Sequence, residues 1–101
     1  MSVISIAKAQ KQLAENTRAR RLQMDLTQEG LAVRSGVPVR TLRKFEQEGT
    51  ISLESFLKLY AALGGIDRLI SATAPVVPPF ASFDEVLQRD TEPKRKRGRR
   101  N

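Results

Sequence analysis

Residues 27–47, TQEGLAVRSGVPVRTLRKFEQ, decide how this chain of 101 residues folds. Thr27 is a residue type that caps the first turn of a helix, and a helical pattern follows it. Gly36 and Pro38 interrupt that pattern, because glycine adopts backbone conformations that other residues avoid and proline does not fit inside a helix. A second helical pattern covers residues 39–47. The stretch therefore predicts two short helices joined by a tight turn.

Each of these two helices has an apolar face. The first helix presents Leu31, Ala32 and Val33, and the second presents Leu42 and Phe45. Residues three or four positions apart share one face of a helix, so we expect these side chains to point inward. The pair is then expected to pack against flanking helices.

A long helix is predicted upstream, over residues 5–23. Lys, Gln, Glu and Arg, which suit helices, fill most of its polar positions. A loose apolar stripe along it consists of Ile6, Ala9, Leu13, Thr17 and Leu22. Asp25 follows, and Asp tolerates the left-handed backbone conformation in which helices often end.

Two more helices are predicted downstream of Gly49, which ends the second helix of the pair. Ser52 caps the first of them, and Gly64-Gly65 ends it. Its apolar positions are Leu53, Phe56, Leu57, Tyr60, Ala61 and Leu63. The second covers residues 66–72, with Ile66, Leu69 and Ile70 expected inside. We therefore predict an all-α fold, a compact five-helix domain over residues 1–72.

Residues 73–88 are predicted to form a proline-rich linker and a short amphipathic helix. Pro75, Pro78 and Pro79 exclude regular structure at its start, and Ser82 and Glu85 fit a capping pair. The apolar side chains of this segment are Phe80, Phe83, Val86 and Leu87. So short a helix is not stable alone, and three docking places stay open: its own domain, a dimer partner, or a groove on another protein.

Most of the net charge of +7 lies in residues 89–101, which carry seven basic and two acidic side chains. We expect this tail to be disordered, because it has no apolar residue to bury and its charges repel one another. It can serve as a solubilising end or as an arm that binds phosphate groups. The basic residues at its end are Lys94, Arg95, Lys96, Arg97, Arg99 and Arg100.

The composition excludes several kinds of chemistry. The chain has no Cys and no His, which rules out thiol catalysis, imidazole acid–base catalysis, disulfides and the usual zinc sites. Ser5-Ile6-Ala7-Lys8 and Ser55-Phe56-Leu57-Lys58 match the S-x-x-K pattern of some acyl-enzymes, but the companion motifs are missing. We therefore expect no enzyme, no cofactor, no metal and no membrane association. The expected location is the reducing cytoplasm, at the nucleoid.

The spacing within residues 28–47 carries a family resemblance. Counted from Gln28, the fifth place holds the small residue Ala32 and the ninth holds Gly36. The fourth, tenth, fifteenth and eighteenth places hold the apolar residues Leu31, Val37, Leu42 and Phe45. This pattern resembles the helix-turn-helix of the lambda repressor and Cro family, the XRE-like regulators. The resemblance covers about residues 13–72 and implies a lambda-repressor-like DNA-binding domain.

Two residues depart from the family pattern. Gly30 stands where an acidic or helix-favouring residue is usual, and it should destabilise the helix by about 0.5–1 kcal/mol relative to Ala. Pro38 stands where Ser or Thr commonly caps the recognition helix, so that side-chain cap is lost or replaced. The stretch TLRKFEQEGTISLESFLKLYAALGG is more narrowly similar to HipB-type antitoxins, which are encoded beside HipA-like kinase toxins.

The resemblance implies that the second helix of the pair enters the major groove of double-stranded DNA. The residues then expected to contact bases are Val39, Arg40, Thr41 and Lys44. Those expected to contact phosphates are Gln28, Arg43, Thr50 and Ser52. Arg21 and Glu46 match positions that form a buried ion pair in repressors of the family. The alternative is that the basic residues bind nothing and form an ordinary solvent-exposed helix face.

The implied function is that of a homodimeric repressor that reads a pseudo-palindromic operator. The narrower similarity makes it the antitoxin that regulates a HipA-like toxin–antitoxin operon, with the kinase toxin as its protein partner. Two other functions remain open. One is an interaction module that neutralises or scaffolds a toxin, with DNA binding secondary, and the other is an XRE-type regulator that is not an antitoxin.

Overall fold

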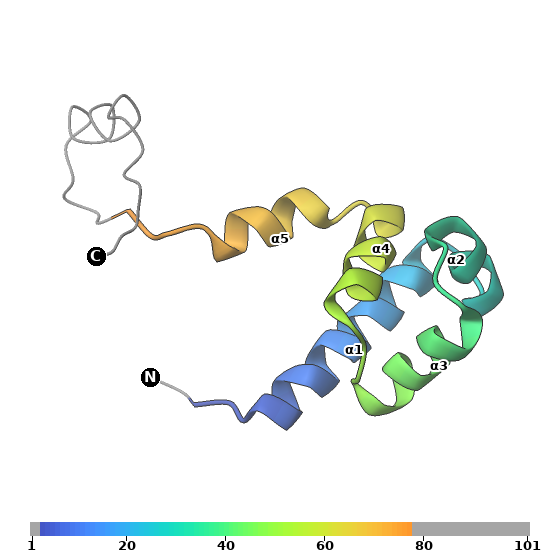
Figure 1. Ribbon diagram of the computed structural model, residues 1–101, viewed down its shortest axis with the longest axis horizontal. Coiled ribbons are helices and arrows are strands. Elements are labelled where there is room, and N and C mark those ends of the chain that lie inside the picture. Colours follow the sequence, from blue (N-terminus) through green and yellow to red (C-terminus); the bar gives the residue numbers. More distant parts are fainter. Residues whose placement is uncertain (1–2, 78–101) are drawn as a thin grey trace.

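The computed structural model of the chain describes residues 3–77, in which every regular element is a helix and no strand occurs (Figure 1). The prediction of an all-α, lambda-repressor-like fold is confirmed. In chain order, the helices are α1 (Ile6–Gln23), α2 (Gln28–Ser35), α3 (Val39–Glu48), α4 (Leu53–Leu63) and α5 (Ile66–Thr73).

Hydroxyl side chains determine where three helices begin. Ser5, Thr27 and Ser52 cap α1, α2 and α4, and each hydroxyl oxygen accepts a hydrogen bond from the backbone N–H three residues later. Such a bond satisfies an N–H group that has no partner within the helix. Asp25 has a φ of 56°, the left-handed conformation expected of it after α1. The predicted helix boundaries therefore agree with the structure to within about one residue, since both follow from the same local signals.

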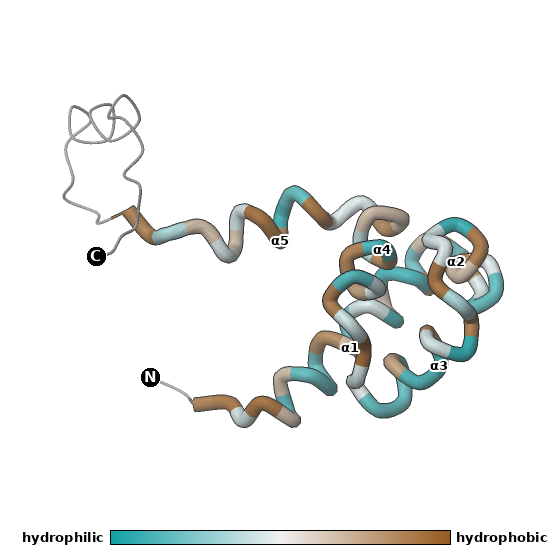
Figure 2. Tube along the Cα trace, viewed as in Figure 1, coloured by the Kyte–Doolittle hydropathy of each residue, from teal (hydrophilic) through white to brown (hydrophobic). Residues whose placement is uncertain are grey.

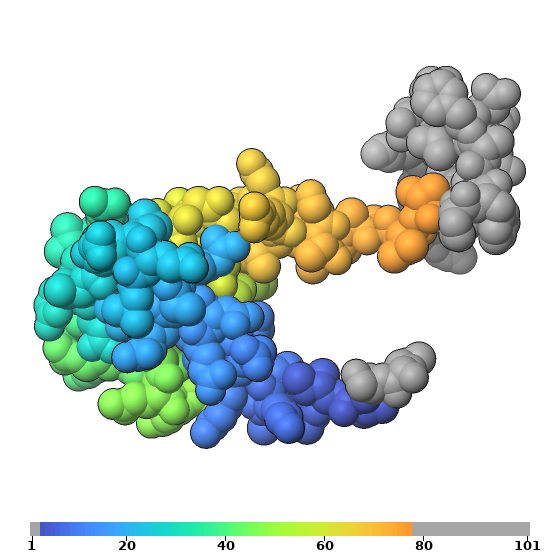
Figure 3. Space-filling model, turned by 180° about the vertical axis from the view of Figure 1, so that it is seen from behind, coloured from blue at the N-terminus to red at the C-terminus, as the bar shows by residue number. Residues whose placement is uncertain are grey.

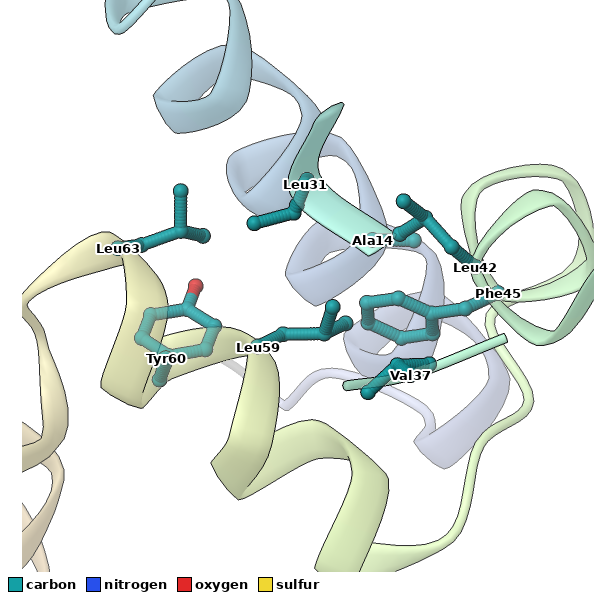
Figure 4. Packing of buried hydrophobic residues seen from close by; sticks show 8 residues of the cluster. All are labelled: Ala14, Leu31, Val37, Leu42, Phe45, Leu59, Tyr60 and Leu63. Atoms are coloured by element: carbon teal, nitrogen blue, oxygen red, sulfur yellow. The ribbon is translucent and has the colours of Figure 1, made fainter. Parts of the chain in front are cut away.

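The hydrophobic core lies where α1, α2, α3 and α4 meet. In Figure 4, Phe45 of α3 and Leu59 of α4 point into the same interior. Phe45 also meets the half-buried Phe56 edge to face, with 5.8 Å between the ring centres. Eight apolar residues form this core, namely Ala14, Leu31, Val37, Leu42, Phe45, Leu59, Tyr60 and Leu63.

The buried face of α1 differs from the predicted apolar stripe. Ile6 is 77% exposed, and Leu13 and Leu22 are also exposed. The buried positions are Ala14, Thr17 and Arg21, so Thr17 is the only fully buried member of the predicted stripe. A hydropathy pattern misplaces this face because two of its members are polar and find their hydrogen-bond partners inside the domain.

Four other residues expected inside lie outside, and Ala61 is one of them. Val33 is 84% exposed, and Leu53 and Ile70 are also exposed. Successive helix residues lie about 100° apart, so a run of apolar residues cannot all face the core. Leu59, which the predicted face of α4 omitted, is fully buried.

Helix α5 extends away from the core and packs against α4 (Figure 1). In Figure 3, α5 and the first turns of α1 project from one side of the domain with open space between them. Both projections carry apolar residues, which appear brown in Figure 2. The apolar residues on α5 and on the first turns of α1 therefore lie outside the core that α1–α4 form.

No helix within residues 3–77 combines the length and the apolar character that crossing a membrane requires. The predicted helix with Phe80, Phe83, Val86 and Leu87, and the basic tail that follows it, lie outside the described residues.

The ends of α3 and α4 give a matched test of backbone packing. Gly49 and Gly64 end these helices with nearly equal φ angles of 80° and 85°. A Cβ atom on Gly49 would lie 3.1 Å from the backbone carbon and oxygen of Gln10, whereas a Cβ on Gly64 would have no atom within 4 Å. We expect Gly64→Ala to destabilise the fold by about 1–2 kcal/mol through the left-handed backbone alone. Gly49→Ala should cost a further ~1–3 kcal/mol, because α1 has to move.

Urea unfolding of the two variants and the unchanged protein measures this difference. Equal destabilisation by both substitutions would show that the close approach of Gly49 to α1 does not constrain the fold.

Candidate nucleic-acid interface

The turn between α2 and α3 determines how the two helices are oriented relative to each other. Gly36 ends α2 with a φ of 78°, and the side chain of Val37 then enters the core. The N–H of Val37 donates a hydrogen bond of 3.2 Å to the Ser35 hydroxyl oxygen. Pro38 precedes α3 in an extended conformation and supplies no side-chain cap, as expected from its missing hydroxyl. The turn is therefore held by backbone geometry and by the buried Val37.

Helix α3 has two chemically different sides. Leu42 and Phe45 are buried, while Arg40, Arg43 and Lys44 are exposed on the other side. Among the side chains of residues 3–77, no carboxylate forms a salt bridge with Arg40 or Lys44. The two cations therefore have no ion pair to break before they meet an anionic surface.

Two of the predicted base-contacting residues lie at the margin of this exposed side. Val39 and Thr41 are half-buried, so each exposes only part of its side chain. Gln47, which the sequence analysis did not select, is exposed and follows Arg40 and Lys44 at helical spacing. This spacing was visible in the sequence, and amides such as that of Gln pair with adenine in the major groove.

A buried ion pair joins α1 to α3. The Arg21 Nε donates to Glu46 Oε2 at 2.8 Å, and Arg21 Nη2 donates to Glu46 Oε1 at 3.1 Å. The two side chains are only 8% and 4% exposed. Arg21 Nη1 also donates to the backbone oxygen of Leu26 at 2.8 Å, so each of the three guanidinium nitrogens makes a hydrogen bond. The two-bond geometry fixes both the distance and the rotation of α3 relative to α1.

Gln28 extends this network to the surface. Its Nε2 donates to Glu46 Oε1 at 3.0 Å, and its Oε1 accepts from Arg43 Nε at 3.3 Å. Arg43 Nη2 also pairs with Glu29 Oε2 at 3.0 Å, where both side chains are well exposed. The structure thus brings together Gln28 and Arg43, two of the residues expected to contact phosphates. The Gln28–Glu46 bond has no signal in the sequence, because it depends on how the helices pack.

The other two residues of this group lie at the start of α4. Thr50 is exposed, and Ser52 is exposed but uses its hydroxyl oxygen to cap the helix. The backbone N–H groups at a helix start favour anions, as they also do beside Gln28 at the start of α2. A hydroxyl that accepts a cap bond still has its own hydrogen to donate.

The arrangement has the features of a binding surface. Nowhere in residues 3–77 do three or more acidic side chains gather as metal ligands would. The Glu46 carboxylate beneath α3 is buried and paired with Arg21, so on the exposed surface of α3 three cations stand against the single carboxylate of Glu48.

Part of the chain matches the model of a known protein family. The family model described as helix-turn-helix matches residues 18–68, just over half of the 101 residues. The match runs from the middle of α1 into α5 and includes the whole α2–turn–α3 unit. No curated protein sequence gives a significant match to the chain.

The buried and exposed ion pairs of the domain allow a matched test. Glu46→Gln keeps the shape of the side chain but leaves the buried Arg21 charge without its carboxylate. We expect a loss of about 3–5 kcal/mol in the free energy of unfolding, because an unpaired buried charge is strongly unfavourable. Glu54→Gln removes one partner of the exposed Glu54–Lys58 pair on α4 and should cost only about 0.3–0.5 kcal/mol.

Denaturant unfolding of both variants measures the two losses. If Glu46→Gln were as mild as Glu54→Gln, the Arg21–Glu46 pair would not hold α1 and α3 together.

Proposed function

Because the chain belongs to the helix-turn-helix family, we propose that it is a dimeric repressor that reads its operator with α3. Membership of this family makes it a DNA-binding transcription regulator. The observation that carries the proposal is the exposed basic side of α3, which lies opposite the buried Leu42 and Phe45.

Base recognition falls to the exposed side of α3 and the start of that helix. Arg40 donates two hydrogen bonds to the O6 and N7 atoms of guanine, the commonest specific contact in the major groove. Lys44, one turn further, contacts the next bases along the groove. The half-buried Val39 offers its methyl groups to a thymine methyl, and Thr41 bonds a neighbouring base edge.

Phosphate contacts flank this helix and fix its register. Gln28 and Arg43 bind one strand together, since they are already joined by a hydrogen bond. The exposed Glu29 of the Arg43–Glu29 pair is readily replaced by a phosphate, because exposed ion pairs contribute little stability. Thr50 and Ser52, at the start of α4, bind phosphate groups of the DNA backbone.

Dimers of this class bind two half-sites about one helical turn apart, ~10 bp from centre to centre. The operator is therefore a pseudo-palindrome, and each copy of the chain places one α3 in the major groove.

We further propose that the regulator is the antitoxin of a HipA-like operon. The support is the narrower similarity of residues 41–65 to HipB-type antitoxins, which spans most of α3, the whole of α4 and the turn between them. In this role the protein represses its own operon and restrains a kinase toxin encoded beside it.

Arg40→Ala tests base recognition. We expect operator binding to weaken by ~1–3 kcal/mol and preference at one base position to relax, while binding to random DNA changes much less. Arg18→Ala on α1 is the matched control, because it removes the same charge from an exposed position away from α3. Binding is measured by titration of labelled DNA at fixed salt, after footprinting on the DNA upstream of the gene has located the operator.

Two outcomes would contradict the assignment of Arg40 to a base. One is an equal loss of affinity for operator and random DNA, and the other is an equal effect of Arg18→Ala.

The antitoxin role is tested through the neighbouring gene. We expect that gene to encode a kinase-like protein whose induced expression stops growth, and co-expression of this chain to restore it. A neighbour without toxicity, or toxicity that this chain does not relieve, would exclude the antitoxin role and leave the repressor role standing.

A further inference from the structure

A groove of about 410 Å³ lies between α1 and α5, on the part of the domain that α3 does not reach. Asn16 and Arg20 of α1 form one wall, and Arg68, Leu69 and Ala72 of α5 form the other. Tyr60 of α4 lies at its base.

The groove is rigid at its base. The Tyr60 side chain is buried, and a hydrogen bond of 3.2 Å joins its hydroxyl group to that of Thr17. Arg20 lies over the Tyr60 ring, with its guanidinium carbon 5.5 Å from the ring centre. A cation over a desolvated aromatic face is attracted by the ring, so Arg20 is held in place.

The groove combines positive charge with apolar surface. Neither Arg20 nor Arg68 has a salt-bridge partner in the part of the chain that the structure describes. Leu69, Ala72 and Ala19 add apolar lining beside these two cations. An occupant that fits therefore has apolar side chains on one face and carboxylates next to them.

We propose that residues 82–88 of the same chain, SFDEVLQ, occupy this groove. The segment offers the apolar side chains Phe83, Val86 and Leu87 at helical spacing, and on such a helix Asp84 lies at the edge of the apolar face whereas Glu85 lies on the far side. The apolar side chains cover Leu69 and Ala72, and Arg20 and Arg68 attract the Asp84 carboxylate.

The connection is long enough for the chain to fold back. Helix α5 has eight residues and is therefore about 12 Å long. The eight residues 74–81 that join it to the segment span up to about 26–29 Å when extended. Ala74 already leaves the helix in an extended conformation, and Pro75 prevents α5 from continuing.

The short connection also favours the same chain over a second copy. A short linker gives a tethered segment an effective concentration in the millimolar range at its own groove. A second copy at micromolar concentration cannot compete unless its contacts are much stronger. Docking within the chain would also start the basic tail of residues 89–101 at a defined place on the domain.

A spin label tests this docking in the full chain. The protein has no cysteine, so Gln88→Cys gives one site for a nitroxide. In ¹⁵N-labelled protein we expect strong paramagnetic broadening of the amide signals of Asn16, Arg68 and Ala72, and none at Val33. The broadening should fall in 1 M salt, where the screening length is only about 3 Å.

Charge reversal of the segment tests the recognition. Asp84→Lys with Glu85→Lys should reduce the broadening several-fold without unfolding the domain, because both residues lie outside it. Asp90→Lys with Glu92→Lys makes the same change of charge outside the segment and should leave the broadening unchanged. Arg20→Glu with Arg68→Glu, added to the first variant, should restore it.

Three results would overturn the proposal. The first is no broadening of the groove residues in the spin-labelled Gln88→Cys protein without any charge reversal. The second is equally strong broadening in ¹⁵N protein that carries no spin label, when spin-labelled ¹⁴N protein is mixed with it, which would mean that a second copy supplies the segment. The third is an equal loss of broadening in both charge-reversal variants, which would mean that net charge and not the groove determines the contact.

Discussion

The bidentate ion pair between Arg21 and Glu46 is the interaction on which the rest of this structure depends. Both side chains are almost completely buried, so each charge requires the other. Leu26 accepts a further hydrogen bond from Arg21, and Gln28 donates one to Glu46. A well-packed apolar pair could be equally stable at these positions. What the ion pair adds is a defined rotation of α3 against α1, which decides which of its residues face outward.

The same network contributes to the basic surface that the domain presents. Residues 1–72 carry eleven basic and seven acidic side chains. Glu46, which lies on the recognition helix itself, is withdrawn into the domain and neutralised by Arg21. Arg40 and Lys44 then face outward with no carboxylate bound to them within residues 3–77. The distribution of charge, and not its total, makes α3 suited to DNA.

The sequence predicted the helix boundaries much better than the buried faces. Ser5, Thr27 and Ser52 act on backbone groups within three residues, so local sequence is enough to place them. The burial of Leu59 and the exposure of Val33 depend on how the helices pack, which local spacing does not specify. Arg21 and Glu46 came from the family resemblance, whereas the bond from Gln28 to Glu46 becomes visible only when three helices are placed together.

Helix α1 connects the recognition helix to the groove at the other side of the domain. Thr17 and Arg21 lie one turn apart on α1, and the first binds Tyr60 while the second binds Glu46. A Cβ atom on Gly65 would come within 2.7 Å of the Tyr60 ring, so the start of α5 lies directly against that ring. One wall of the groove and the orientation of α3 therefore depend on the same two turns of α1. A displacement of α1 at Thr17 would also shift Arg21 and with it α3, and a displacement at Arg21 would also shift the groove.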